Sequence, residues 1–150
     1  ASLHGISPKD SFLALKNSKG VKRRFETVFQ NDHKIVIDDF AHHPTAISNT
    51  VQAATNYFPS KRILGIVELA SNTMSQGHHG EDLYESASGL GKAYWLNLSS
   101  QKNKEFEYDS IKLLLTDLEK DIENFDVILI MSNKDSKKIS EPIIDLIKNK

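Results

Sequence analysis

The run KIVIDDFAHHPTAI, residues 34–47, opens on an apolar stretch and continues into two carboxylates, two histidines and a proline. The β-branched residues 35–37 favour an extended strand. Pro44 suits the first position of a helix, where a missing N–H costs nothing. The run therefore predicts a strand that passes directly into a helix, which is the repeating unit of α/β proteins.

The same alternation of strands and helices continues on both sides of this junction. The runs FETVFQ and KIVID, joined by NDH, predict a β-hairpin before the junction. Apolar periodicity and buried runs predict the remaining elements. Further strands are expected at 62–69, 92–98 and 126–131. A short helix is expected from Pro8 to near KNSKG, residues 16–20, and longer helices at 44–57, 81–89, 111–122 and 139–148. This order predicts an α/β fold: a Rossmann-like, mainly parallel sheet with helices on both faces and an N-terminal β-hairpin.

Composition restricts the classes of partner. The 150 residues fit one domain, and a formal net charge of −1 offers no electrostatic basis for binding nucleic acid or an anionic membrane. No apolar run approaches the roughly 18 residues of a membrane span, and no signal peptide is visible. The absence of cysteine excludes disulfides and thiol catalysis and fits a reducing compartment. We expect a cytoplasmic protein that binds neither nucleic acid nor membrane.

Ligands of parallel sheets bind beyond the carboxyl ends of the strands, here 38–45, 69–80 and 132–138. In the first segment, Asp38 or Asp39 can accept ribose hydroxyls while a histidine donates to a phosphate at the helix N-terminus. Alternatively, one of these side chains caps the helix and the others are solvated. The second segment is a long polar loop, suited either to a polar ligand or simply to solubility. The third, KDSKK, is expected to be a solvated turn.

Further patterns in the sequence bear on phosphate or metal chemistry. The histidine pairs 42–43 and 78–79 match no known ligand spacing, so no metal site is expected. No GxxxxGK[ST] loop occurs, and GLGKAY lacks the third glycine of a dinucleotide fingerprint. The cations of GVKRRFE, residues 20–26, serve either solubility or contact with a phosphate held by another domain.

Taken together, GVKRRFE, IDDFAHHPTAI and SNTM resemble the C-terminal domain of the Mur ligases, the ATP-dependent amide-forming enzymes of bacterial cell-wall synthesis. The resemblance implies a three-domain enzyme, whose N-terminal domain holds a UDP-sugar and whose central domain carries the phosphate-binding loop and most Mg²⁺ ligands. It implies that residues 1–19 are the tail of the central ATPase domain plus a linker. Residues 20–150 would be the C-terminal domain, which closes over ATP.

The resemblance also assigns roles to individual residues. Arg24 matches the arginine that reaches the γ-phosphate, and Asp39 matches the carboxylate at the ATP ribose. His42, with His43 beside it, matches the histidine near the phosphates, so the catalytic residues would be Arg24 and His42. The residues expected to face the incoming peptide are Ser71, Asn72, Thr73 and Met74.

SNTM indicates the branch that joins the tripeptide L-alanyl-γ-D-glutamyl-meso-diaminopimelate to UDP-N-acetylmuramate in peptidoglycan recycling, through an acyl phosphate. Two alternatives remain: the sister enzyme that adds L-alanine, and a non-catalytic nucleotide-binding module on the same fold. The chain departs from the branch at Leu69 and Ala70, where proline and arginine are usual, and at 134–138, where the branch is glycine-rich. This chain alone should be inactive, since it contains no phosphate-binding loop.

Overall fold

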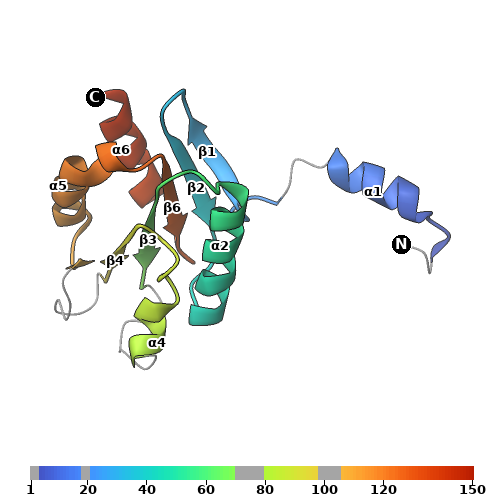
Figure 1. Cartoon of the computed structure of the whole chain (residues 1–150), viewed down its shortest axis with the longest axis horizontal. Helices are drawn as coiled ribbons and strands as arrows, with labels where there is room; N and C mark the ends of the chain where they lie inside the picture. The colour runs from blue at the N-terminus through green and yellow to red at the C-terminus, as the bar shows by residue number, and fades with distance from the viewer. Residues whose placement is uncertain (1–3, 18–20, 70–79, 98–105) are drawn as a thin grey trace.

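The computed structural model describes residues 4–17, 21–69, 80–97 and 106–150. It contains a six-stranded sheet in the order β1-β2-β6-β3-β4-β5 (Figure 1). The strands are β1 (Glu26–Gln30), β2 (Ile35–Asp39), β3 (Ile63–Glu68), β4 (Lys92–Leu96), β5 (Glu107–Tyr108) and β6 (Val127–Met131). The helices are α1 (Pro8–Lys16), α2 (Pro44–Tyr57), α4 (Gly80–Glu85), α5 (Ile111–Asp121), the short 3-10 turn η2 (Ile122–Asn124) and α6 (Lys137–Lys148). β1 and β2 form the antiparallel hairpin and the other pairings are parallel, which confirms the predicted fold class.

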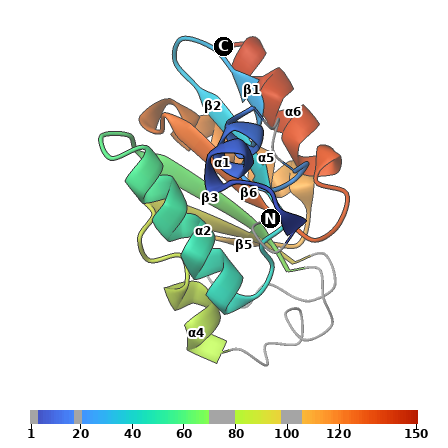
Figure 2. The same ribbon diagram turned by 90° about the vertical axis from the view of Figure 1, so that its right-hand side faces the viewer.

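Helices cover both faces of the sheet, with α5 and α6 on one face and α2 and α4 on the other (Figures 1 and 2). Successive side chains of a strand point to opposite faces. Val36 therefore packs in the core under α5 and α6, whereas Ile37 packs in the core under α2. All six residues of β3 are buried, as expected for a central parallel strand. Each fully buried aliphatic side chain contributes about 1.5–3 kcal/mol to stability.

The strand order places three carboxyl ends side by side. β6 lies between β2 and β3, and Met131 pairs with Asp39 on one side and with Val67 on the other. Residues that directly follow β2, β3 and β6 therefore meet at one edge of the sheet, although they are far apart in sequence. This edge positions the candidate site.

Several details differ from the sequence predictions. The two-residue strand β5 was not predicted, and α4 ends at Glu85 instead of at residue 89. The 3–4 residue spacing of Ile47, Val51, Ala54 and Tyr57 predicts one apolar stripe along α2, but Tyr57 is 73% exposed whereas the other three are buried. The last helix begins at Lys137, two residues earlier than expected.

Helix α1 begins as the sequence predicts, since the Ser7 hydroxyl accepts a hydrogen bond from the Asp10 N–H at 3.1 Å. It buries none of its residues and stands apart from the sheet (Figure 1). Its apolar side chains are consequently exposed, with Phe12 at 67% and Leu15 at 75%. Among the described residues, no helix is long and apolar enough to cross a membrane.

Candidate functional site

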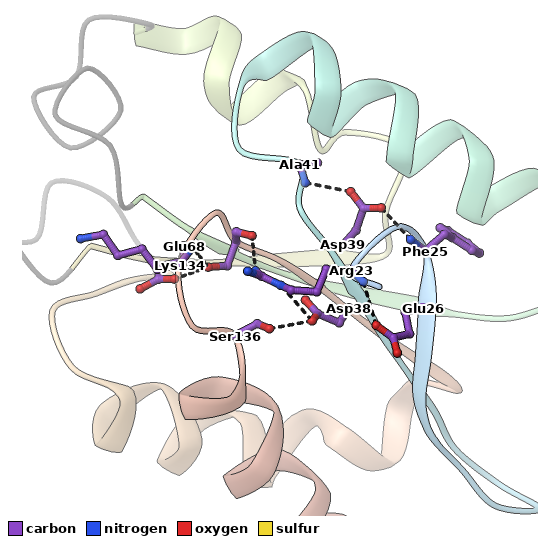
Figure 3. A network of polar contacts seen from close by, with 10 residues as sticks. Arg23, Phe25, Glu26, Asp38, Asp39, Ala41, Glu68, Lys134 and Ser136 are labelled. Carbon is purple, nitrogen blue, oxygen red and sulfur yellow. Dashed lines mark hydrogen bonds and ion pairs between the residues drawn. The ribbon is translucent and has the colours of Figure 1, made fainter. Parts of the chain in front are cut away.

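The edge formed by the carboxyl ends of β2, β6 and β3 holds a network of polar contacts (Figure 3). Asp38 is 4% exposed, and its Oδ2 accepts hydrogen bonds from Arg23 Nε at 3.2 Å and from Ser136 Oγ at 2.6 Å. The Arg23 guanidinium also donates to the Ser132 carbonyl at 2.6 Å. Arg23 therefore joins the end of β2 to the end of β6, and Ser136 joins β2 to the start of α6.

Asp39 points to the opposite face and is equally enclosed, with 6% exposure. One carboxylate oxygen accepts the Phe25 N–H at 2.8 Å. The other accepts the Ala41 N–H at 2.8 Å and the Thr50 hydroxyl at 3.2 Å. Since a carboxylate offers about four acceptor positions, most of its capacity is used within the protein. Its predicted contact with ribose stays a prediction.

Arg24 lies in a turn whose backbone is unusual on both sides. Arg23 has φ 57° and Phe25 has φ 50°, in the left-handed region that residues other than glycine rarely adopt. The Arg24 side chain is exposed, and its guanidinium lies 5.1 Å from the centroid of the Phe40 ring. A cation over an aromatic face is attracted by the ring quadrupole. The turn thus presents one arginine outward beside the strand end.

His42 has a defined orientation. Its Nδ1 lies 2.9 Å from the Phe40 carbonyl oxygen, and its ring packs edge-on against the Phe40 ring at 5.3 Å. Because a carbonyl only accepts, Nδ1 must carry the proton, and Nε2 is the nitrogen available to a ligand. The neighbouring His43 is the exposed N-cap residue of α2 and makes no capping hydrogen bond with its side chain.

Two buried residues that sequence reasoning missed also belong to this edge. Glu68 ends β3 with 7% exposure, and Ser132 follows β6 with none. The Ser132 hydroxyl donates to the Glu68 carboxylate and accepts the Lys134 N–H at 3.0 Å. An acid within the apolar run RILGIVEL was the available signal for Glu68, because buried carboxylates are rare unless partnered.

The run KDSKK corrects one expectation. Lys134, Asp135 and Lys137 are exposed, as expected for a solvated turn, but Ser136 is buried and bonded to Asp38. Its side chain is held by the strand end, so the turn is only partly solvated.

The predicted peptide-facing residues, Ser71, Asn72, Thr73 and Met74, lie outside the described residues. So do His78 and His79 of the second histidine pair. Among the described ranges, no group of three or more histidine, cysteine, aspartate or glutamate side chains is arranged to hold a metal ion.

Comparison with known proteins places this edge in a family. Residues 23–134, which include Arg23, the two aspartates and Ser132, match the domain described as Mur ligase, glutamate ligase domain. The chain belongs to the Mur ligase family. The UDP-N-acetylmuramate–L-alanine ligase of Christiangramia forsetii is 37% identical over 114 residues, which cover 75% of this chain and 25% of that protein.

The solved structures that are similar to this Mur ligase domain include two from the murein peptide branch. The murein peptide ligase of Psychrobacter arcticus 273-4 superposes with a TM-score of 0.73 at 28% identity, over 97% of this chain and 34% of that one. A domain from Haemophilus ducreyi 35000HP, provisionally named as a UDP-N-acetylmuramate:L-alanyl-γ-D-glutamyl-diaminopimelate ligase, gives 0.64 at 26% identity over 81% of this chain and 98% of that one. The chain thus spans a quarter to a third of the full-length relatives named here.

Proposed function

We propose that this chain is the nucleotide-facing C-terminal domain of an ATP-dependent ligase that joins L-alanyl-γ-D-glutamyl-meso-diaminopimelate to UDP-N-acetylmuramate. The observation that carries the proposal is the exposed Arg24, whose guanidinium lies over the same Phe40 ring that His42 packs against, just before the start of α2. A helix N-terminus and an arginine are both suited to bind phosphate. The similarity to the Psychrobacter murein peptide ligase over nearly the whole chain supports the choice of substrate.

In the proposed reaction, ATP phosphorylates the carboxylate of UDP-N-acetylmuramate, and the peptide amine attacks the acyl phosphate and displaces phosphate. Arg24 stabilises the charge on the γ-phosphoryl group during transfer. His42 contacts the phosphates through Nε2, with His43 beside it, and Asp39 contacts the ribose. Ser71, Asn72, Thr73 and Met74 face the peptide.

Magnesium neutralises the phosphates in reactions of this kind. The described residues of this domain offer no cluster of three ligand side chains, so we assign the Mg²⁺ ligands mainly to the central domain and no metal-dependent step to this one.

The apolar surface of α1 supports the proposed domain division at residue 19. Phe12, Leu13 and Leu15 of the helix are exposed, as is Ile6 just before it. An exposed apolar cluster of this kind marks a surface that another part of a protein covers. We propose that the preceding central domain covers it, and that residues 1–19 belong to that domain and its linker.

A second candidate is the ligase that adds L-alanine to UDP-N-acetylmuramate. The 37% identity to the Christiangramia enzyme over three quarters of this chain favours it. Both candidates share the acyl-phosphate chemistry and differ only in the amine that attacks.

The deciding experiment measures phosphate release by the complete polypeptide supplied with ATP, Mg²⁺ and UDP-N-acetylmuramate, with either the tripeptide or L-alanine as the amine. Release that depends on the tripeptide supports the recycling ligase, whereas release that depends on L-alanine assigns the chain to the second candidate. ADP binding without release under either condition contradicts both and favours a non-catalytic module. The present chain alone is expected to release no phosphate.

A further inference from the structure

Arg23 and Arg24 are adjacent arginines whose guanidinium groups lie 5.3 and 5.1 Å from the centroid of the Phe40 ring. The Arg23 side chain is 28% exposed and bonded to Asp38 and to the Ser132 carbonyl, whereas Arg24 is exposed. We propose that Arg23 and Asp38 are positioning residues that fix the direction of the Arg24 side chain. The expected effect on kcat rests on the proposed function of Arg24. The expected effect on the Arg23–Arg24–Phe25 turn does not.

The turn needs external support, because its backbone is strained on both sides of Arg24. Left-handed conformations of residues other than glycine persist only where the surroundings over-determine them. At Arg23 the surroundings act on three separate groups. The N–H donates to Glu26 Oε2 at 2.7 Å, the carbonyl accepts the Phe40 N–H at 3.0 Å, and the guanidinium bonds to Asp38 and to the Ser132 carbonyl.

Phe25 fixes the other side of the turn. Its N–H donates to Asp39, and its ring packs against those of Phe58 and Tyr57, with centroids 6.5 and 6.0 Å away. Arg24 is therefore held between two neighbours that are both anchored to the sheet.

Asp38 can act on the site only through its neighbours. Asp38 is only 4% exposed. Its Oδ1 is enclosed and has no hydrogen-bond partner in the described part of the chain, and its Oδ2 accepts hydrogen bonds from Arg23 and Ser136. The ion pair also requires an arginine. The planar guanidinium reaches Asp38 and the Ser132 carbonyl at once, whereas the single ammonium of lysine lacks this fork.

The kinetic test is a double-mutant cycle of Asp38→Asn and Arg24→Ala in the complete polypeptide. Asp38→Asn should lower kcat about 10- to 100-fold, as expected for a displaced catalytic group, and leave the KM for UDP-N-acetylmuramate unchanged. In the Arg24→Ala background, Asp38→Asn should cause no further loss. Arg23→Lys should behave like Asp38→Asn. Multiplicative losses would overturn the proposal, because Asp38 would then act independently of Arg24.

Asp126→Asn is the matched control. The Asp126 carboxylate accepts the Arg62 N–H at 2.7 Å at the amino-terminal end of the sheet, far from the turn. This variant should lose stability without the loss of kcat. An equal loss of kcat in Asp38→Asn and Asp126→Asn would mean that Asp38 affects turnover only through the stability of the fold, and it would overturn the proposal.

A second test needs no enzymatic activity and uses the present chain. Trypsin cleaves after arginine, and the anchored turn should protect the bonds that follow Arg23 and Arg24. Asp38→Asn and Arg23→Lys should accelerate cleavage at these bonds several-fold and leave cleavage after Arg62 unchanged. If the complete polypeptide proved inactive, the proposed function would fail, but the cleavage rates would still show whether Arg23 and Asp38 hold the turn in place. Unchanged cleavage in both variants would overturn the positioning role.

Discussion

Asp38 and Asp39 are consecutive residues whose carboxylates serve opposite faces of the sheet. Asp38 bonds to Ser136 at the start of α6, and Asp39 bonds to Thr50 within α2. Each also holds one neighbour of Arg24, since Asp38 binds the Arg23 side chain and Asp39 binds the Phe25 N–H. The two carboxylates at the end of β2 therefore bond to a helix on each face of the sheet and to both neighbours of Arg24.

The first prediction concerns Arg24. Arg24→Ala in the complete polypeptide should lower kcat about 10²- to 10³-fold, the usual cost of losing one group that stabilises transition-state charge. Stability should change little, because the Arg24 side chain is exposed and packs against the ring of Phe40. Arg62→Ala is the matched control, because Arg62 is also exposed and lies 5.1 Å from the Phe125 ring at the other end of the sheet. Turnover at the wild-type rate in Arg24→Ala would remove Arg24 from the site.

The second prediction separates the two nitrogens of His42. The side-chain nitrogen of asparagine reproduces Nδ1 and can keep the bond to the Phe40 carbonyl, whereas that of glutamine reproduces Nε2. If Nε2 contacts the phosphates, His42→Gln should retain more ADP affinity than His42→Asn. Each lost contact is expected to weaken binding by about 1 kcal/mol, or roughly five-fold in Kd. Calorimetric titration of the complete polypeptide with ADP measures both, and the reverse order of affinities would count against a role for Nε2.

Local signals in the sequence located most elements. Pro44 sets the start of α2, the Ser7 cap sets the start of α1, and the β-branched run before Asp38 forms β2. These features act within a few residues, so they can be read without knowledge of the rest of the chain. The carboxyl ends of the strands were also predictable as the place for polar residues.

Contacts between distant segments could not be predicted. The insertion of β6 between β2 and β3 brings Ser132 to Glu68 and to Arg23, which are 64 and 109 positions away. The side chains of Arg23 and Arg24 differ in exposure because of the backbone angles of one turn. Two consecutive arginines in a sequence do not reveal these angles. The enclosure of Asp39 likewise depends on a donor from the linker side, Phe25, that strand periodicity does not reveal.

The third prediction tests packing beneath the site. A Cβ added at Gly65, in the central strand β3, would overlap the Leu90 side chain. The obstructing atom is a terminal methyl group of the half-buried Leu90, which can partly move aside, so Gly65→Ala should destabilise the chain by at most about 1 kcal/mol, measured by urea denaturation. In a Leu90→Ala background the obstructing methyl groups are gone, so the same substitution should cost nearly nothing. An equal cost in both backgrounds would show that the loss has another origin.

The fourth prediction concerns acid stability on the α5 side of the sheet. Hydrogen bonds from Lys92 and then Tyr94 to the Asp121 carboxylate hold its pKa below the ordinary value of an aspartate. A depressed pKa stabilises the fold at pH above the unfolded value, about 3.9, and this contribution disappears as the pH falls through the lower folded value.

Asp121→Asn should therefore lower the free energy of unfolding at neutral pH by about 0.5–1 kcal/mol, a range kept small because the carboxylate is 27% exposed and partly screened by solvent. The difference from the wild type should shrink below about pH 4 as the native carboxylate becomes protonated. Urea denaturation across this pH range measures the effect. Asp145→Asn, at an exposed aspartate of α6, is the control and should show no such trend. A difference that stayed constant down to the acid limit would mean that the charge of Asp121 contributes nothing and that only its shape matters.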